Sequence, residues 1–302
     1  MKSKNKSIRN KKLYDKIRRN FSGWILLLPT ILLLCFVVLR PMFMGIINSF
    51  YELRGFTPTE FVGLENYIQI IKDTKFLSTI GNTVLYVVWS LIIGLPLPFL
   101  CAIMLNEMVI GKSFIRISTY MPAVIPAVAV SLIWTNMYME GHGGLLNMIL
   151  GMFGVEPQQW LMNKSLTIPL IIVSMTWQGF GSTILYYYAM LQSVNAELYD
   201  AARIDGAGLL SRAKNVVMPH MLPIFLLMGV KQIITVFQVI DQPLVMTGGG
   251  PNGASTTLAL LGYQYAFQFG QTGKALAINV ITFILLIGLT FVYFKAEKKF
   301  AE

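Results

Sequence analysis

Six apolar stretches, each long enough to cross a lipid bilayer, constrain the fold of this 302-residue chain more than any other feature. A transmembrane helix needs about 20 predominantly apolar residues. The stretches cover residues 24–48, 79–105, 117–138, 167–192, 219–241 and 274–294. Only 13% of all residues are charged, whereas a soluble domain carries about 25%. The sequence therefore predicts an all-α membrane protein with six transmembrane helices.

The distribution of Lys and Arg predicts how these helices are oriented. Nine of the 24 Lys and Arg residues lie within residues 2–19, directly before the first apolar stretch. The loops that would face outward are residues 51–78, 139–166 and 242–272. Together these loops hold only four Lys and Arg. Because positive residues concentrate on the cytoplasmic side of a membrane, both termini are predicted to be cytoplasmic. Residues 1–22 would form a basic tail and residues 23–302 the transmembrane domain.

The net charge of +10 could suggest a nucleic-acid-binding protein. The charge is concentrated in the N-terminal tail and the predicted cytoplasmic loops, however, where it orients helices in a membrane. We therefore predict contact with membrane lipid and no nucleic-acid partner. Cys35 and Cys101 lie within apolar stretches and have no metal-ligand spacing around them, so no metal site is predicted.

Prolines interrupt two of the apolar stretches. Pro96 and Pro98 lie in the second stretch, and Pro122 and Pro126 lie in the third. Proline removes a backbone donor and kinks a helix, which is tolerated in lipid where neighbouring helices or a water-lined cavity satisfy the freed carbonyls. Kinked helices around a translocation pathway are expected, although kinks that only improve packing are an equal alternative for each proline.

No apolar stretch has an acidic residue at its centre, so the sequence lacks the usual groups that couple transport to an ion gradient. All 14 Asp and Glu residues lie in loops or near the ends of the stretches, whereas ion-driven transporters usually place acidic or His side chains inside the membrane. The nucleotide-like pattern Gly111-Lys112-Ser113 has Asn106 where a P-loop needs glycine. No nucleophile or metal partner accompanies the two histidines in the sequence. We predict that the chain is not an enzyme and that any energy enters through a partner.

One polar segment, residues 195–218, interrupts the apolar sequence on the predicted cytoplasmic side. Asn195 is a good N-cap, and Glu197 and Asp200 follow where the helix dipole favours negative charge. Gly206 is a natural C-cap, and a second short helix is predicted after it. A compact helix of this kind suits the groove of a protein partner. An interfacial helix that lies on lipid is an equal alternative on physical grounds.

The segment "ELYDAARIDGAGLLSRAKNVVMPHMLP", residues 197–223, resembles the EAA motif of ABC importer permeases. Two further segments precede it: "FVGLENYIQII" at residues 61–71 and "NTVLYVV" at residues 82–88. The segment "LVMTGGGPNGAST", residues 244–256, follows it. In this order, the four segments resemble the MalF-like carbohydrate-uptake branch of these permeases over nearly the whole chain.

The resemblance implies a permease subunit of an ATP-driven importer in a bacterial cytoplasmic membrane. Residues 195–218 would be its coupling helix segment, which docks on a cytoplasmic ATPase. The residues expected to take part in coupling are Glu197, Asp200, Ala201, Ala202, Asp205, Gly206 and Ala207. The chain departs from the motif at Asp200, where Glu is usual, and at Ala213, where a large aromatic is common. Docking is therefore expected to differ in detail from that of other members.

The resemblance also implies the partners of the chain. They are a homologous second permease, a dimer of the ABC ATPase, and an extracellular solute-binding protein that delivers a sugar or oligosaccharide. The ATPase would use ATP and Mg²⁺, and this chain is expected to bind no cofactor. Two other functions are alternatives: a self-contained facilitator or channel for a small polar solute, and a membrane sensor that recruits a cytoplasmic partner.

A sugar pathway needs polar groups that replace water, together with apolar surface. The candidates in the fourth and fifth stretches are Trp177, Gln178, Lys231, Thr235 and Gln238. The last three share one helical face by their spacing, and a charge such as that of Lys231 inside a span normally faces an aqueous cavity or a partner. For each residue, ordinary packing or a tie between helices is an equal alternative.

Two further groups of residues are assigned to the membrane boundary and the outer surface. Tyr186, Tyr187 and Tyr188 are expected to belong to an interfacial aromatic belt. The glycine run Gly248–Pro251 lies in a predicted outer loop that has no Lys or Arg. It is expected to form a tight external loop that contacts the solute-binding protein.

Overall fold

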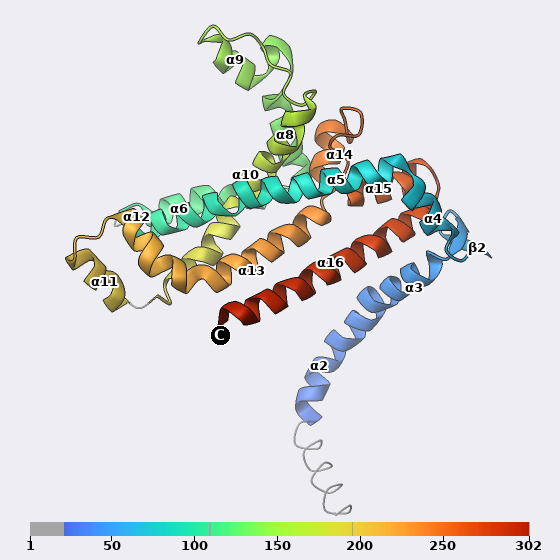
Figure 1. Ribbon diagram of the computed structural model, residues 1–302, viewed down its shortest axis with the longest axis horizontal. Coiled ribbons are helices and arrows are strands. Elements are labelled where there is room, and N and C mark those ends of the chain that lie inside the picture. Colours follow the sequence, from blue (N-terminus) through green and yellow to red (C-terminus); the bar gives the residue numbers. More distant parts are fainter. Residues whose placement is uncertain (1–20, 109, 195, 302) are drawn as a thin grey trace, which may run out of the picture.

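The computed structural model describes the backbone of residues 21–108, 110–194 and 196–301, and this part of the chain is mostly helical (Figure 1). Residues 1–20, which make up most of the predicted basic tail, lie outside the described residues. The predicted helical class is confirmed, with the exception of one short β-hairpin.

Within the described residues, five helical segments are long and apolar enough to cross a membrane. They are Gly23–Asn48, Thr74–Glu107, Lys164–Leu191, Lys214–Phe237 and Thr272–Lys295. A sixth candidate is a pair of shorter segments, Lys112–Val124 and Ala127–Met137, which meet at an angle of 99°. Each of the six apolar stretches of the sequence corresponds to one of these segments or to the bent pair.

Short elements connect and interrupt the long helices. The first half of the described chain contains α2 (Phe21–Leu33), a π-helical segment (Leu34–Leu39), α3 (Arg40–Asn48), β1 (Tyr51–Arg54), β2 (Thr57–Phe61), α4 (Glu65–Lys72), α5 (Thr74–Trp89), a second π-helical segment (Ser90–Gly94), α6 (Pro96–Glu107), α7 (Lys112–Tyr120), a 3₁₀ turn (Met121–Val124), α8 (Ala127–Met137), another 3₁₀ turn (Gly141–Gly143) and α9 (Leu145–Gly151). The second half contains α10 (Lys164–Leu191), α11 (Ala196–Ile204), α12 (Leu209–Arg212), a π-helical segment (Ala213–Val217), α13 (Met218–Phe237), α14 (Asp241–Thr247), α15 (Leu258–Tyr263), a last π-helical segment (Gln264–Gln268) and α16 (Thr272–Ala301).

The third apolar stretch is broken rather than kinked. Ile125 has an extended backbone, with φ −76° and ψ 133°, because the ring of the following Pro126 disfavours the helical conformation in the residue before it. The helix restarts as α8 directly after Pro126. As a result, α8 lies beside α14 and the first half of α10, and α9 projects beyond them (Figure 1).

A β-hairpin follows the first span, and the all-α prediction missed it. Strands β1 and β2 pair antiparallel, with Tyr51 opposite Phe61. Gly55, in the turn between the strands, has a φ of +61°, a conformation that costs glycine little. The pairing satisfies backbone groups just beyond the end of an apolar helix, which hydrophobic periodicity did not indicate.

The core between α6, α10 and α13 contains one of the tyrosines that the sequence placed in an interfacial belt. Tyr187 is fully buried, and its ring packs edge-on against Phe99 with 5.2 Å between ring centroids. Tyr186 is exposed, since successive residues of a helix point about 100° apart. The belt prediction is therefore wrong for Tyr187.

Candidate functional site

The predicted polar segment folds as a helix, a glycine turn and a second short helix. α11 ends two residues before Gly206, whose φ is +74°. The N–H of Ala207 donates to the carbonyl of Ala202 at 2.9 Å, the bond that closes a helix around a left-handed residue. The structure thus confirms the predicted C-cap at Gly206.

α11 occupies one end of the molecule (Figure 1). Of the predicted coupling residues, Glu197, Ala201 and Asp205 are exposed there, and Ala202 is half-buried. The side chain of Ile204 is 86% exposed. α11 thus presents small, acidic and apolar residues together, a composition that the groove of a protein partner can bind.

Some predicted details of this segment cannot be compared with the structure. The predicted N-cap, Asn195, lies outside the described residues, and so do the side chains of Asp200 and Ala213. Beyond the glycine turn, α12 and the following π-helical segment lead into α13. Val217, at the end of the π-helical segment, and Met221 in α13 are buried in the core. The predicted coupling segment is therefore continuous with the fifth span.

Two side-chain contacts join this region to the end of α6. Arg212 in α12 forms an ion pair with Glu107, with 3.1 Å between Nη2 and Oε2. The amide of Gln192, just after α10, donates to Asn106 Oδ1 at 2.9 Å. Sequence reasoning missed Glu107 and Gln192, because their partners lie 105 and 86 residues away and no local pattern indicates such a contact.

A polar cavity of about 510 Å³ lies between α10, the end of α13 and α14. Its polar lining consists of Gln178, Ser182, Thr235, Gln238, Asp241 and Gln242. Three of the five predicted pathway residues, Gln178, Thr235 and Gln238, are thus brought to one cavity. Apolar side chains such as those of Met175 and Ile234 complete the wall.

Gln178 also holds the broken third span. Its Nε2 donates to the carbonyl of Ile125 at 3.0 Å, next to the proline break. Its Oε1 accepts a hydrogen bond from Gln242 Nε2 at 3.1 Å. Gln178 therefore ties α10 to the break and to α14, in addition to lining the cavity.

The other two predicted pathway residues lie elsewhere. Trp177 packs edge-on against Trp134 of α8, with 5.9 Å between ring centroids. The Lys231 ammonium lies 4.4 Å from the centre of the Tyr186 ring, a cation–π contact. Neither residue lines the polar cavity.

The glycine run after α14 is anchored to α5. Gly248 and Gly249 have positive φ values of 60° and 91°, so the turn is as tight as predicted. The loop that follows does not project freely, since Asn82 donates to the carbonyl of Gly253 at 2.7 Å and Tyr86 to that of Ser255 at 3.0 Å. A second polar pocket, of about 500 Å³, lies beside this loop.

A further tie holds the start of α5. The Asp73 carboxylate caps α5 by accepting from the Lys75 N–H at 2.8 Å, and it also accepts from the Tyr265 hydroxyl. Burial is the main cause that raises the pKa of Tyr265, and the neighbouring Asp73 carboxylate raises it further. The Tyr265 hydroxyl therefore stays protonated and remains a donor to Asp73.

The chain matches known transport proteins over most of its length. Residues 94–301 match the family described as "Binding-protein-dependent transport system inner membrane component". The trehalose/maltose transport system permease MalF of Thermococcus litoralis is 30% identical, covering 94% of this chain and 96% of that protein. The multiple sugar-binding transport system permease MsmF of Streptococcus mutans is 34% identical, covering 94% of this chain and 98% of that protein.

A solved structure has the same fold. A bacterial ABC transporter involved in the import of the acidic polysaccharide alginate contains a chain that superposes with a TM-score of 0.84. It is 21% identical and covers 96% of this chain and 100% of its own. The family match and the two sugar permeases confirm the resemblance indicated by the EAA-like segment. The chain belongs to the family of inner membrane components of binding-protein-dependent transport systems.

Proposed function

We propose that this chain is a permease subunit of an ATP-driven ABC importer that takes up a sugar or oligosaccharide. The observation that carries the proposal is the similarity, over 94% of the chain, to two permeases that are named for sugar transport. The importer would lie in a bacterial cytoplasmic membrane. ATP and Mg²⁺ would be bound by the ATPase, and this chain would supply the pathway and the coupling surface.

The orientation with both termini inside is supported by the basic residues near α11. Lys112, Arg116, Arg212 and Lys214 all belong to the connections at this end of the spans. Positive residues favour the cytoplasmic side. In this orientation the exposed α11 faces the compartment in which an ATPase dimer would bind. The small and acidic residues of α11 would then fit a groove of the ATPase.

The polar cavity supplies a place for a sugar. Its amide and hydroxyl groups can exchange hydrogen bonds with sugar hydroxyls, and its apolar wall can contact the ring faces. Thr235 and Gln238 are exposed in the single chain although they lie near the end of a membrane-length helix. A homologous second permease would cover them and complete the pathway.

The opposite end of the molecule would receive a solute-binding protein. The pocket beside the glycine loop is lined by Lys75, Ser78, Asn252 and Gln264. These groups can form hydrogen bonds to another protein surface. The firm attachment of the loop to α5 means that this surface would be presented in a defined shape.

The proposal predicts that transport needs the whole assembly. The chain would be purified with a second permease, the ATPase dimer and the solute-binding protein encoded beside it, and then reconstituted in liposomes. Uptake of radiolabelled sugars from a panel should require ATP and the binding protein, and liposomes with this chain alone should show none. Sugar flux through this chain alone would indicate a facilitator. Binding of a cytoplasmic protein without any transport by the assembly would indicate a sensor.

A further inference from the structure

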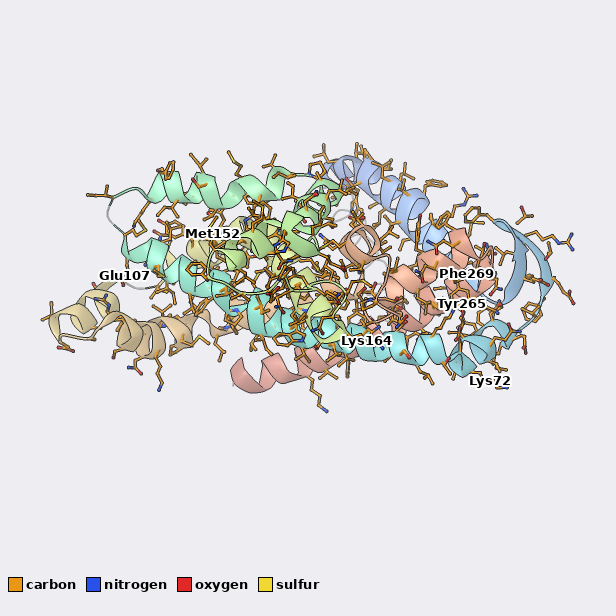
Figure 2. All side chains as sticks on the ribbon, turned by 90° about the horizontal axis from the view of Figure 1, so that it is seen from above. Lys72, Glu107, Met152, Lys164, Tyr265 and Phe269 are labelled. Carbon is orange, nitrogen blue, oxygen red and sulfur yellow. The ribbon has the colours of Figure 1, made fainter. Side chains whose placement is uncertain are left out.

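The cytoplasmic end of α6 is a junction between four segments of the chain. The side-chain oxygen of Asn106 accepts a hydrogen bond from the Gln192 amide. The backbone carbonyl of Asn106 accepts one from the Lys112 ammonium at 3.0 Å. The next residue, Glu107, forms the ion pair with Arg212. Four segments therefore meet at Asn106 and Glu107: α6 itself, the residue that follows α10, the start of α7, and α12. Figure 2 shows Glu107 at the end of the molecule where α11 and α12 lie.

The ion pair at this junction is shielded from bulk water. The side chains of Arg212 and Glu107 are only 13% and 18% exposed. Salt screens a partly buried pair less than it screens a surface pair. Leu105, Leu191 and Val217, which come from the same converging segments, are buried together in one apolar cluster. The pair and this cluster join α12 to the end of the second span.

The second span can carry a displacement of α12 a long way through the molecule. Thr74–Glu107 is a helical segment of 34 residues, and its other half carries Asn82 and Tyr86. These two side chains hold the loop after α14 by hydrogen bonds to the Gly253 and Ser255 carbonyls. A single helical segment thus connects the contact with Arg212 to the loop at the opposite end. A rigid element whose position both sites can bias is one physical route for coupling between distant sites.

We propose that Glu107 and Arg212 are a positioning pair that transmits movement of the coupling segment to the second span. The inference rests on the proposed function, since it assumes that α11 docks on an ATPase. When the ATPase displaces α11 and α12, the pair moves the end of α6 with them. Without the pair, α12 can move while α6 stays behind, and ATP is hydrolysed with less transport.

The test compares single, conservative and exchanged variants in the reconstituted complex. The variants are Arg212→Gln, Glu107→Gln, Arg212→Lys and the charge exchange Glu107→Arg with Arg212→Glu. Lys164→Gln is the control, because Lys164 is an exposed cation at the start of α10 and lies outside residues 195–218. Three quantities are measured: copurification with the ATPase, ATP hydrolysis, and sugar taken up per ATP hydrolysed.

The Gln variants should copurify with the ATPase but lose at least about fivefold in sugar taken up per ATP, the low end of the usual range of allosteric coupling. Arg212→Lys and the charge exchange should recover most of the ratio, and Lys164→Gln should match the unmodified protein. An unchanged ratio in the Gln variants would overturn the proposal, as would equal losses in Arg212→Lys and Arg212→Gln. Loss of copurification in Arg212→Gln that Arg212→Lys does not restore would also overturn it. If the unmodified complex shows no ATP-dependent uptake, the proposed function fails instead.

Discussion

The two ends of the second span hold their neighbours in different ways. In α5, Asn82 and Tyr86 donate to backbone carbonyls of the loop after α14, and Ser255 in that loop is fully buried. At the end of α6, Asn106 and Glu107 contact the side chains of Gln192 and Arg212. Figure 2 places Glu107 at one end of the molecule and Lys72, which precedes α5, at the other.

This difference indicates which end is built to move. The Ser255 carbonyl is buried, and a buried carbonyl is costly to leave without a donor, so the bond from Tyr86 favours one position of the loop. At the end of α6, the bond between Gln192 and Asn106 is exposed, so water can replace a lost partner there at lower cost. We therefore expect a fixed joint at the loop end. At the predicted coupling end we expect a joint whose exposed contacts adjust while the shielded Arg212–Glu107 pair holds.

The largest expected effect comes from adding bulk at the coupling end. Gly206→Trp should reduce ATP-dependent sugar uptake by about tenfold or more, because an indole at the glycine turn would obstruct docking of α11. Gly154→Trp is the matched control: its φ of +73° nearly equals the +74° of Gly206, and both positions have open space around them. Uptake and ATP hydrolysis in liposomes measure the effect. If both variants lose uptake equally, backbone strain rather than docking is the cause.

A second effect, on stability rather than on transport, is expected at the fixed joint. Gly249→Ala should lower the free energy of unfolding by about 3 kcal/mol, through left-handed strain and overpacking. The added Cβ would lie 2.6 Å from Thr256 Oγ1. At Gly248, φ is also positive but the space is open, so Gly248→Ala should cost only about 1–2 kcal/mol. Thermal unfolding of the purified complex compares the two, and equal melting temperatures would contradict a tightly packed loop.

The smallest effect is expected in the cavity between the two joints. Gln238→Ala should raise the KM for sugar uptake by roughly twofold to tenfold, the loss of about one hydrogen bond, with no change in melting temperature. Gln178→Ala should raise KM and also lower the melting temperature, because Gln178 bonds to Ile125 and Gln242. Sugar titrations and thermal unfolding measure both quantities. Identical behaviour of the two variants would show that Gln178 has no structural role beyond that of Gln238.

Much of the architecture could be predicted because lipid restricts the choices. A bilayer requires continuous apolar helices, so the spans follow from hydropathy and length. The helix–glycine–helix form of residues 196–212 followed from local conformational preference, and the left-handed Gly206 confirms it. The break at Pro126 was indicated as a kink, but its angle of 99° depends on the packing of α8 and α14 and on the bond from Gln178.

Part of the candidate site could be predicted from the regular spacing of residues along a helix. Helical spacing placed Thr235 near Gln238, and both line the cavity. Spacing along a helix does not say which turn faces a cavity, and Lys231, one turn earlier, lies against Tyr186 instead. The burial of Tyr187 shows the same limit, because three consecutive tyrosines look alike until neighbouring helices cover one of them.

The sequence by itself determined the membrane class, the positions of the spans and the polar segment with its glycine turn. These features depend on hydrophobicity and backbone preference, which act over a few neighbouring residues. Only the tertiary structure decided that Arg212 meets Glu107, that Tyr86 holds Ser255 and that three polar side chains share a cavity. Those contacts join residues that are far apart in the chain, and they form only once the helices have packed together.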